Sequence, residues 1–137
     1  MKKTEILHSG IICAIIFLER NNVTVEFYRT ETGIKPAGEF IKSIENIKLR
    51  AKVVRSIGLL ETYGENLREP DSSPLGGGIF ELRTIHGDNI ARCLYFFFCG
   101  DKAIITNRFI KKTRKTPPGE IELARKYKAD YERRNTK

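Results

Sequence analysis

The chain has 137 residues, of which 40% are hydrophobic and 31% are charged, and its formal net charge is +8. A chain of this length forms one domain with its own core, and so many charged residues argue against a protein embedded in a membrane. The excess charge is local: residues 108–137 hold 11 Lys or Arg against 4 Asp or Glu, whereas residues 1–107 hold 14 against 13. This charge favours a polyanion partner such as RNA, although a solvated basic helix or a surface covered by an acidic protein would also carry it.

Residues 1–22 allow two interpretations. Lys2 and Lys3 precede the apolar run 11–18, but Glu19 follows at once without the cleavage site of a signal peptide. The run is also too short to span a bilayer, which takes about 20 residues. It forms either a buried strand joined to the next one by a hairpin, or an extension ahead of a domain that covers residues 23–134.

The three cysteines, Cys13, Cys93 and Cys99, fit no zinc-binding or Cys-x-x-Cys spacing. Cys93 and Cys99 lie in or beside an apolar run, so we expect reduced, mostly buried thiols in a cytoplasmic protein. A catalytic thiol is not expected, because neither His8 nor His86 is well placed to activate one.

One strand and two helices are expected next. Strict alternation predicts a half-buried strand over 23–28. Pro36 favours a helix over 36–44, and apolar residues at helical spacing predict a second helix over 47–63. Two successive helices should form a hairpin that covers one face of a sheet. We interpret the cations on the polar face of the second helix as solvated: Lys48, Arg50, Lys52 and Arg55.

The segment 64–78 is rich in Pro, Ser and Gly, which predicts a loop. Its three consecutive glycines precede a strand rather than a helix, so they do not form a phosphate-binding loop. Three apolar runs follow, 79–85, 90–98 and 103–110, separated by Gly-Asp turns. This pattern predicts an antiparallel meander, and a basic run at 111–115 leaves its last strand.

The turn at Gly87-Asp88 predicts a register in which Arg83 lies opposite Arg92 on the same face. Like charges that oppose each other across strands are destabilising. Glu81 on the same face could bridge the two arginines, or both side chains could extend to water. Alternatively, the pair binds an anion, and the sequence leaves these possibilities open.

The segment Thr116-Pro117-Pro118 predicts the start of a C-terminal helix, with Thr116 as N-cap and Pro117 at the first helical position. The apolar stripe of this helix consists of Ile121, Ala124, Tyr127 and Tyr131. The expected fold is α+β: an antiparallel sheet of three or four strands, a helical hairpin on one face, and a C-terminal helix.

Several blocks of the sequence together are similar to one protein family: VEFYRTETG at 25–33, PAGEFI at 36–41, KLRAKVVRSIGLLETYG at 48–64, SPLGGGIFELR at 73–83, ARCLYFF at 91–97 and NRFIKKTRKTPPGEIELARKYKADY at 107–131. The chain resembles the phage-derived host-killing toxin-like branch of the RelE/HigB/ParE superfamily of type II toxins. The order of the ELR, YFF and FIKKTRKTP blocks carries this likeness, and residues 1–22 lie outside it.

The resemblance implies a small toxin with a helical hairpin on a twisted antiparallel sheet, neutralised by an antitoxin that is often a small helix-turn-helix protein. RelE- and HigB-like members cut mRNA, usually in the ribosomal A site, and need no metal or other cofactor. ParE-like members share the fold but inhibit DNA gyrase. A phage remnant that binds nucleic acid without cutting it is a third possibility.

The resemblance implies a candidate site, made of the residues of this chain that match the family's site positions. Arg83 in the ELR block matches the strand arginine that contacts the scissile phosphate. Lys112 and Arg114 fall in the basic loop that carries further catalytic cations. Such cations can align the attack of the RNA 2′-hydroxyl and stabilise charge on the phosphoryl oxygens. The residues expected to hold neighbouring phosphates are Arg92, Arg108, Lys111 and Lys115.

The chain departs from the family pattern in its acid–base groups. Typical RelE members carry a tyrosine shortly after the last strand, where this chain has Pro117-Pro118. Tyr127 and Tyr131 look like core residues, and His86 at a hairpin tip is more simply a turn residue. The general acid and base are therefore not identified.

Overall fold

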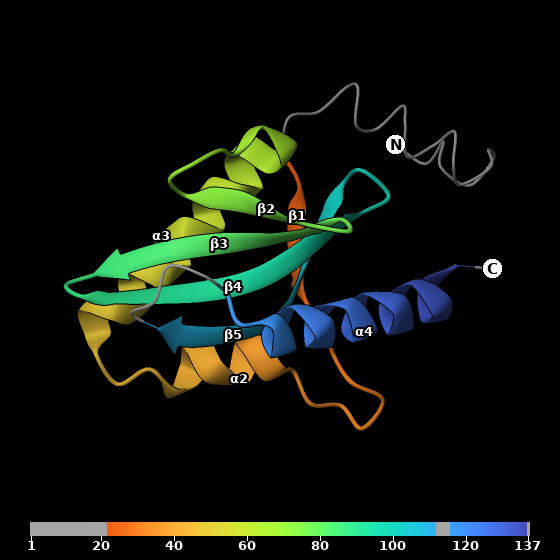
Figure 1. Cartoon of the computed structure of the whole chain (residues 1–137), viewed down its shortest axis with the longest axis horizontal. Helices are drawn as coiled ribbons and strands as arrows, with labels where there is room; N and C mark the ends of the chain where they lie inside the picture. Colours follow the sequence, from red (N-terminus) through yellow and green to blue (C-terminus); the bar gives the residue numbers. More distant parts are fainter. Residues whose placement is uncertain (1–21, 112–115, 137) are drawn as a thin grey trace.

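The structure is a computed structural model that describes residues 22–111 and 116–136, without the side chains of residues 109–111. Strands and helices follow one another in a mixed order along the chain (Figure 1). They are β1 (Thr24–Phe27), α2 (Pro36–Ser43), α3 (Ile47–Tyr63), the 3₁₀ helix η2 (Gly64–Asn66), β2 (Ser72–Gly76), β3 (Ile79–His86), β4 (Asn89–Phe98), β5 (Lys102–Lys111) and α4 (Pro118–Asn135).

The strands form one five-stranded sheet in the order β1-β5-β4-β3-β2. The pairs β2–β3, β3–β4 and β4–β5 are antiparallel, which confirms the meander, whereas β1 runs parallel to β5. The α+β class is therefore confirmed, but the expectation of a purely antiparallel sheet of three or four strands was wrong. The additional strand, β2, forms inside the predicted loop because Ser72 and Ser73 pair with Leu82 and Glu81 of β3.

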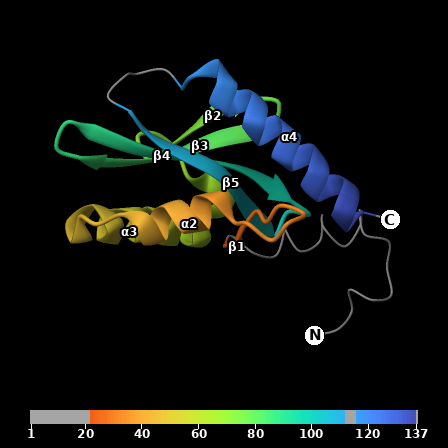
Figure 2. The same ribbon diagram turned by 90° about the horizontal axis from the view of Figure 1, so that it is seen from below.

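Helices cover both faces of the sheet. Figure 2 shows α2 and α3 on one face, as the predicted hairpin requires, and α4 on the other. Each face has its own apolar core, because side chains alternate between the faces along every strand. The α2–α3 side includes Ala37, Leu60, Leu82, Tyr95 and Ile105. The α4 side includes Tyr28, Ile79, Phe96, Ile104 and Tyr131.

Local signals set most helix boundaries. Helix α3 has the predicted bounds, and its N-cap Asn46 accepts a hydrogen bond from the Leu49 N–H at 3.1 Å. Helix α4 begins at Pro118, one residue later than predicted, with Pro117 at the N-cap position and no side-chain cap. The prediction of Thr116 as N-cap was wrong, because its hydroxyl donates to Glu81 of β3 instead.

The cysteine expectation holds in part. Cys93 is a buried free thiol, and burial raises its pKa to about 12. Cys99 is disulfide-bonded, so the expectation that it is a reduced thiol was wrong. Cys13 and the interpretations of residues 1–22 concern a segment outside the described residues, apart from Asn22. No described helix is long and apolar enough to cross a membrane.

Candidate functional site

The predicted register of β3 and β4 is confirmed: Arg83 lies directly opposite Arg92. Both belong to the face of the sheet that α4 covers. Along β3 this face also holds the buried Ile79, and along β4 it holds Leu94 and Phe96. The two arginines therefore extend the α4-side core towards the end of the sheet at which β5 leads into the basic run.

Glu81, which the sequence offered as a bridge between the two arginines, binds Arg83. It is 1% exposed, and its Oε2 accepts a hydrogen bond from Arg83 Nε at 2.5 Å. Its other oxygen, Oε1, accepts from the hydroxyl of Thr116. A buried carboxylate is stable only where donors compensate for its lost hydration, and here a charged and a neutral donor do so.

The opposed arginines differ in their access to solvent. A quarter of the Arg83 side chain is exposed, and its Nη1 lies 3.8 Å from Oε1 of the largely exposed Glu69. That distance is beyond a hydrogen bond, and an exposed ion pair of this kind contributes little. Arg92 is 1% exposed. Arg83 is therefore held at Nε and partly exposed, whereas Arg92 lies beneath the surface.

A second polar cluster fixes the start of α4 on β5. Asn107 Nδ2 donates to the backbone oxygen and to Oε1 of Glu120, at 3.1 and 3.0 Å. Thr106 donates to Asn107 Oδ1 at 2.6 Å and to Leu94 O at 3.1 Å. These residues lie where the register of β4 and β5 shifts. Strand alternation alone does not reveal such a shift, so no pattern in the sequence indicated that Thr106 and Asn107 anchor α4.

The basic run is described only at its ends. The backbone of Lys111 pairs with Ile90 at the end of β5, and Thr116 is tied to Glu81. Both flanks of the run are thus fixed on the sheet near Arg83. The predicted site residues Lys112, Arg114 and Lys115 lie outside the described residues, as does the side chain of Lys111.

Arg108 is not brought together with Arg83. It pairs with Cys93 on the opposite face of the sheet, where its guanidinium lies 4.6 Å from the centre of the Phe40 ring of α2. This contact is within the range of a cation–π interaction. The geometry therefore supports a packing role for Arg108, while its contact with RNA stays a prediction.

Aromatic and imidazole groups occupy structural positions. Tyr127 stacks on Tyr28 with ring centres 4.4 Å apart, and Tyr131 is buried against Phe96, so both are core residues as expected. His86 ends β3, and its Nε2 lies 3.4 Å from Asn46 Nδ2 at the start of α3. None of these side chains contacts Arg83 within the described part of the chain.

A groove of about 450 Å³ lies beside Arg83, between α3 and β3. Lys52 and Arg55 of α3 line it together with Asp71, so two helix cations interpreted as solvated share a groove with the strand arginine. Two exposed cations beside one acid leave a net positive charge at this groove, which suits an anionic ligand. Among the described residues, no group of three or more His, Cys, Asp or Glu could hold a metal ion.

Comparison with known proteins identifies the family of the chain. A family model described as "Phage derived protein Gp49-like" (DUF891) matches residues 39–129, about two thirds of the chain, and these residues include Arg83, Glu81 and Thr116. No curated protein matches the sequence. The chain therefore belongs to the phage-derived Gp49-like family, a toxin-like family of the RelE/HigB type.

Proposed function

We propose that the protein is the toxin of a type II toxin–antitoxin pair and a metal-independent endoribonuclease that cuts mRNA on the ribosome. The observation that carries this proposal is the state of Arg83, whose Nε is held 2.5 Å from the buried Glu81 while a quarter of its side chain is exposed. A guanidinium fixed on one edge and open on the other can bind a phosphate in one orientation.

The reaction uses a nucleophile that RNA itself supplies. The 2′-hydroxyl loses its proton and attacks the adjacent phosphorus, and the 5′-oxygen leaves and gains a proton. The products are a 2′,3′-cyclic phosphate and a 5′-hydroxyl. Negative charge builds on the two non-bridging oxygens during this exchange, and the terminal nitrogens of Arg83 would stabilise it. Because Glu81 already orients the guanidinium, little reorganisation is needed at that moment.

Lys112 and Arg114 are proposed to complete the catalytic group. Thr116 lies two residues after Arg114, and its hydroxyl donates to the same carboxylate that holds Arg83. Their proposed task is to stabilise the phosphoryl oxygens or assist proton transfer.

Further cations are proposed to hold the flanking RNA. Lys111 is the last residue of β5 and Lys115 belongs to the basic run after it, and Lys52 and Arg55 line the groove beside Arg83. Arg92 was expected in this group, but its burial supports a role beneath the binding surface.

The proposed protein partner is a cognate antitoxin, a small helix-turn-helix protein that meets the toxin in the cytoplasm. The family supports such a partner because it is toxin-like. The surplus of basic residues after residue 108 favours an acidic toxin-binding segment over residues 111–115 and α4. Complex formation should therefore weaken as the ionic strength rises.

Brief induction in bacteria, followed by mapping of mRNA ends and inspection of plasmid DNA, tests the proposal. We expect growth arrest, rapid loss of translation and discrete cuts in mRNA. Double-strand-broken DNA with intact mRNA would instead identify a gyrase inhibitor. Normal growth with intact mRNA and DNA would identify a protein that binds nucleic acid without cutting it.

A further inference from the structure

The two edges of the sheet differ in how they are protected against further strand pairing. At one edge, β2 is short, contains Pro74 and has a register shift between Pro74 and Gly76. Proline and bulges are common devices that prevent an edge strand from pairing with another chain. At the other edge, β1 has neither device, and its register with β5 is regular from Thr24 to Phe27.

The outer side of β1 offers unused backbone groups. Thr24 N–H donates to Asp101 O at 2.9 Å, and Tyr28 N–H donates to Ile105 O at 2.8 Å. In a parallel ladder alternate residues face the same neighbour, so the backbone groups of Val25 and Phe27 point away from β5. Within the described part of the chain, β1 is the last strand and no other strand covers this side.

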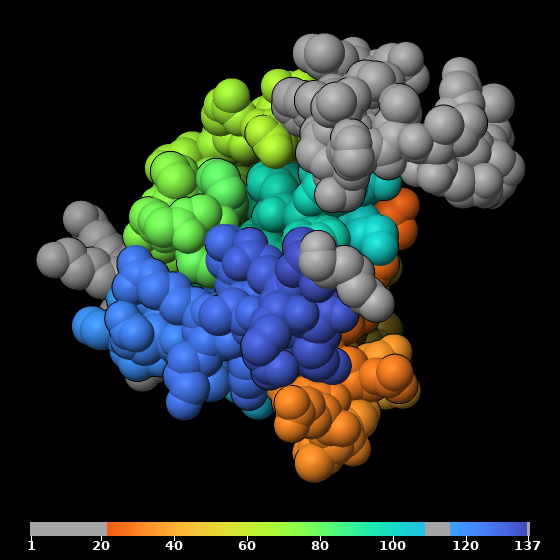
Figure 3. Space-filling view, turned by 90° about the vertical axis from the view of Figure 1, so that its right-hand side faces the viewer, coloured from red at the N-terminus to blue at the C-terminus, as the bar shows by residue number. Residues whose placement is uncertain are grey.

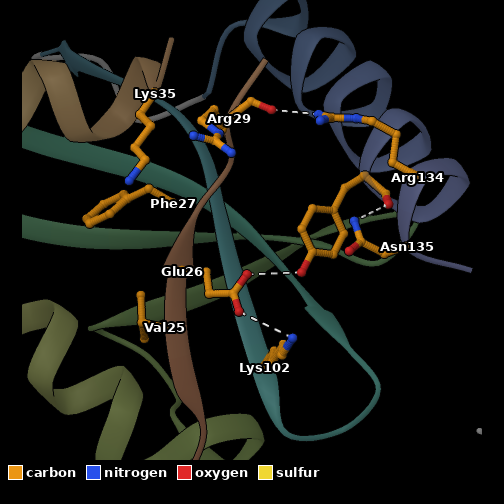
Figure 4. A pocket seen from close by; sticks show the side chains of 9 residues that line it. Val25, Glu26, Phe27, Arg29, Lys35, Lys102, Arg134 and Asn135 are labelled. Atoms are coloured by element: carbon orange, nitrogen blue, oxygen red, sulfur yellow. Dashed lines mark hydrogen bonds and ion pairs between the residues drawn. The ribbon is translucent and has the colours of Figure 1, made fainter. Parts of the chain in front are cut away.

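A groove of about 650 Å³ lies along the same strand, between β1 and the C-terminal end of α4 (Figure 4). The space-filling view shows that end of α4, in dark blue, beside the orange segment around the β1–α2 connection (Figure 3). Several contacts join them, among them a hydrogen bond that Arg134 Nη2 donates to Arg29 O at 2.5 Å. Side chains of Val25 and Phe27 add a half-buried apolar lining.

The charge of this groove is positive. Its cations are Arg29, Lys35, Lys102 and Arg134, against the single acid Glu26. Glu26 is already engaged, because it lies 3.3 Å from Lys102 Nζ and accepts a hydrogen bond from Tyr131 OH at 3.0 Å. Arg29 and Lys35 are exposed, and neither forms an ion pair with another described residue. An anionic ligand would therefore find two unneutralised cations beside a strand edge that no other described strand covers.

We propose that an extended, acidic segment of a partner protein binds here and adds to β1 as a sixth strand. Its backbone would pair with Val25 and Phe27, and its carboxylates would meet Arg29 and Lys35. A second copy of this chain would bring the same cations to the edge, so charge disfavours self-pairing. RNA would match the charge but would leave the backbone groups of β1 without strand partners.

This surface is separate from the site of the proposed function. Strands β5 and β4 lie between β1 and β3, which carries Arg83. A segment bound at β1 therefore does not depend on RNA cleavage. Binding can be measured with purified protein whether or not the protein cuts RNA, so failure of one proposal leaves the other intact.

The probe is a short synthetic peptide of alternating Glu and Val with blocked ends, and the matched peptide has Lys in place of Glu. We expect the acidic peptide to bind and to slow amide hydrogen exchange at Val25 and Phe27. Its affinity should fall as salt is added. The basic peptide should not bind. If the acidic peptide slows amide exchange only at other residues, the proposal is wrong. It is also wrong if single-stranded RNA slows exchange at Val25 and Phe27 and the acidic peptide does not.

Two variants test the two parts of the recognition. Val25→Pro removes an outward N–H without removing a hydrogen bond to β5, and Arg29→Glu with Lys35→Glu reverses the charge. Each should weaken peptide binding about tenfold or more. Lys48→Glu, a charge reversal at an exposed position of α3, should leave it unchanged. If Val25→Pro lowers the melting temperature, the double variant Arg29→Glu with Lys35→Glu still tests the proposal. An unchanged affinity of this double variant for the acidic peptide contradicts the proposal.

Discussion

Arg83 and Arg92 face each other across β3 and β4, yet a quarter of the Arg83 side chain is exposed while Arg92 is buried. Two equal charges in equivalent positions thus have different surroundings. The carboxylate of Glu81 lies on the Arg83 side of this pair, 2.5 Å from Nε. Arg83 consequently forms an ion pair with a buried carboxylate and is, in the proposed function, the arginine that meets a phosphate.

Loss of Arg83 should reduce stability. Arg83→Ala leaves the buried Glu81 with Thr116 as its remaining described donor, which should cost about 1–3 kcal/mol in the free energy of unfolding. Urea unfolding of Arg83→Ala, Glu81→Gln and the double variant gives the coupling energy, which we expect at about 0.5–3 kcal/mol. If repulsion between the arginines dominates, the midpoint of Arg83→Ala will instead equal or exceed that of the wild type.

Asp130 should make the protein sensitive to acid. Its Oδ2 accepts from Tyr28 OH at 2.5 Å and pairs with Arg134 at 2.6 Å, and these contacts lower the pKa of the Asp130 carboxyl. A carboxyl with a lowered pKa stabilises the fold above its unfolded pKa of about 4, and this contribution is lost as the pH falls further. Melting curves from neutral to acid pH should therefore converge for wild type and Asp130→Asn. Parallel curves would contradict this assignment.

Cys93 should be inert in the folded protein. Its side chain is buried, and its pKa of about 12 leaves almost no thiolate near neutral pH. A thiol reagent should modify Cys93 only after unfolding, as followed by mass spectrometry of the peptide that contains it. Rapid modification under native conditions, without loss of secondary structure, would show that the α2–α3 side of the sheet is open.

Arg108 should contribute to packing rather than to RNA binding. Its guanidinium lies over the Phe40 ring at 4.6 Å, and a contact of this kind is worth about 0.5–2 kcal/mol. Arg108→Gln should lower the stability by that amount and leave the salt dependence of RNA binding unchanged. A decrease of about 0.7 in the slope of log K against log salt would show that Arg108 holds a phosphate after all.

Much of the fold could be predicted from local patterns. Helix α3 has strong apolar periodicity and a polar N-cap, and the turn at Gly87 determines the register that opposes Arg83 to Arg92. Strand β2 could not be found in this way, because Ser, Pro and Gly show no apolar alternation and its pairing is provided by β3. The parallel neighbour of β1 is β5, which comes much later in the chain, and no local pattern encodes that pairing.

The candidate site was predictable by residue type but not by environment. Alternation placed Glu81, Arg83 and Arg92 on one face, as observed. The surroundings of Glu81 depend on Thr116, whose hydroxyl binds it from 35 residues away in the sequence. Likewise, Arg108 stacks on a ring that only the packing of α2 brings close. Residue spacing contains no information on such contacts.

The most direct test of the account is the chemistry of mRNA ends after brief induction of wild type, Arg83→Gln and Arg125→Gln. Arg125 is a matched control, because it is an exposed arginine of α4 whose ion pair with Glu122 lies at the surface. We predict discrete cuts with 5′-hydroxyl ends for wild type and Arg125→Gln, and at least about a hundredfold fewer for Arg83→Gln, provided that it is folded. Cuts by folded Arg83→Gln at the wild-type level would contradict the central role of Arg83, and 5′-phosphate ends would contradict attack by the 2′-hydroxyl.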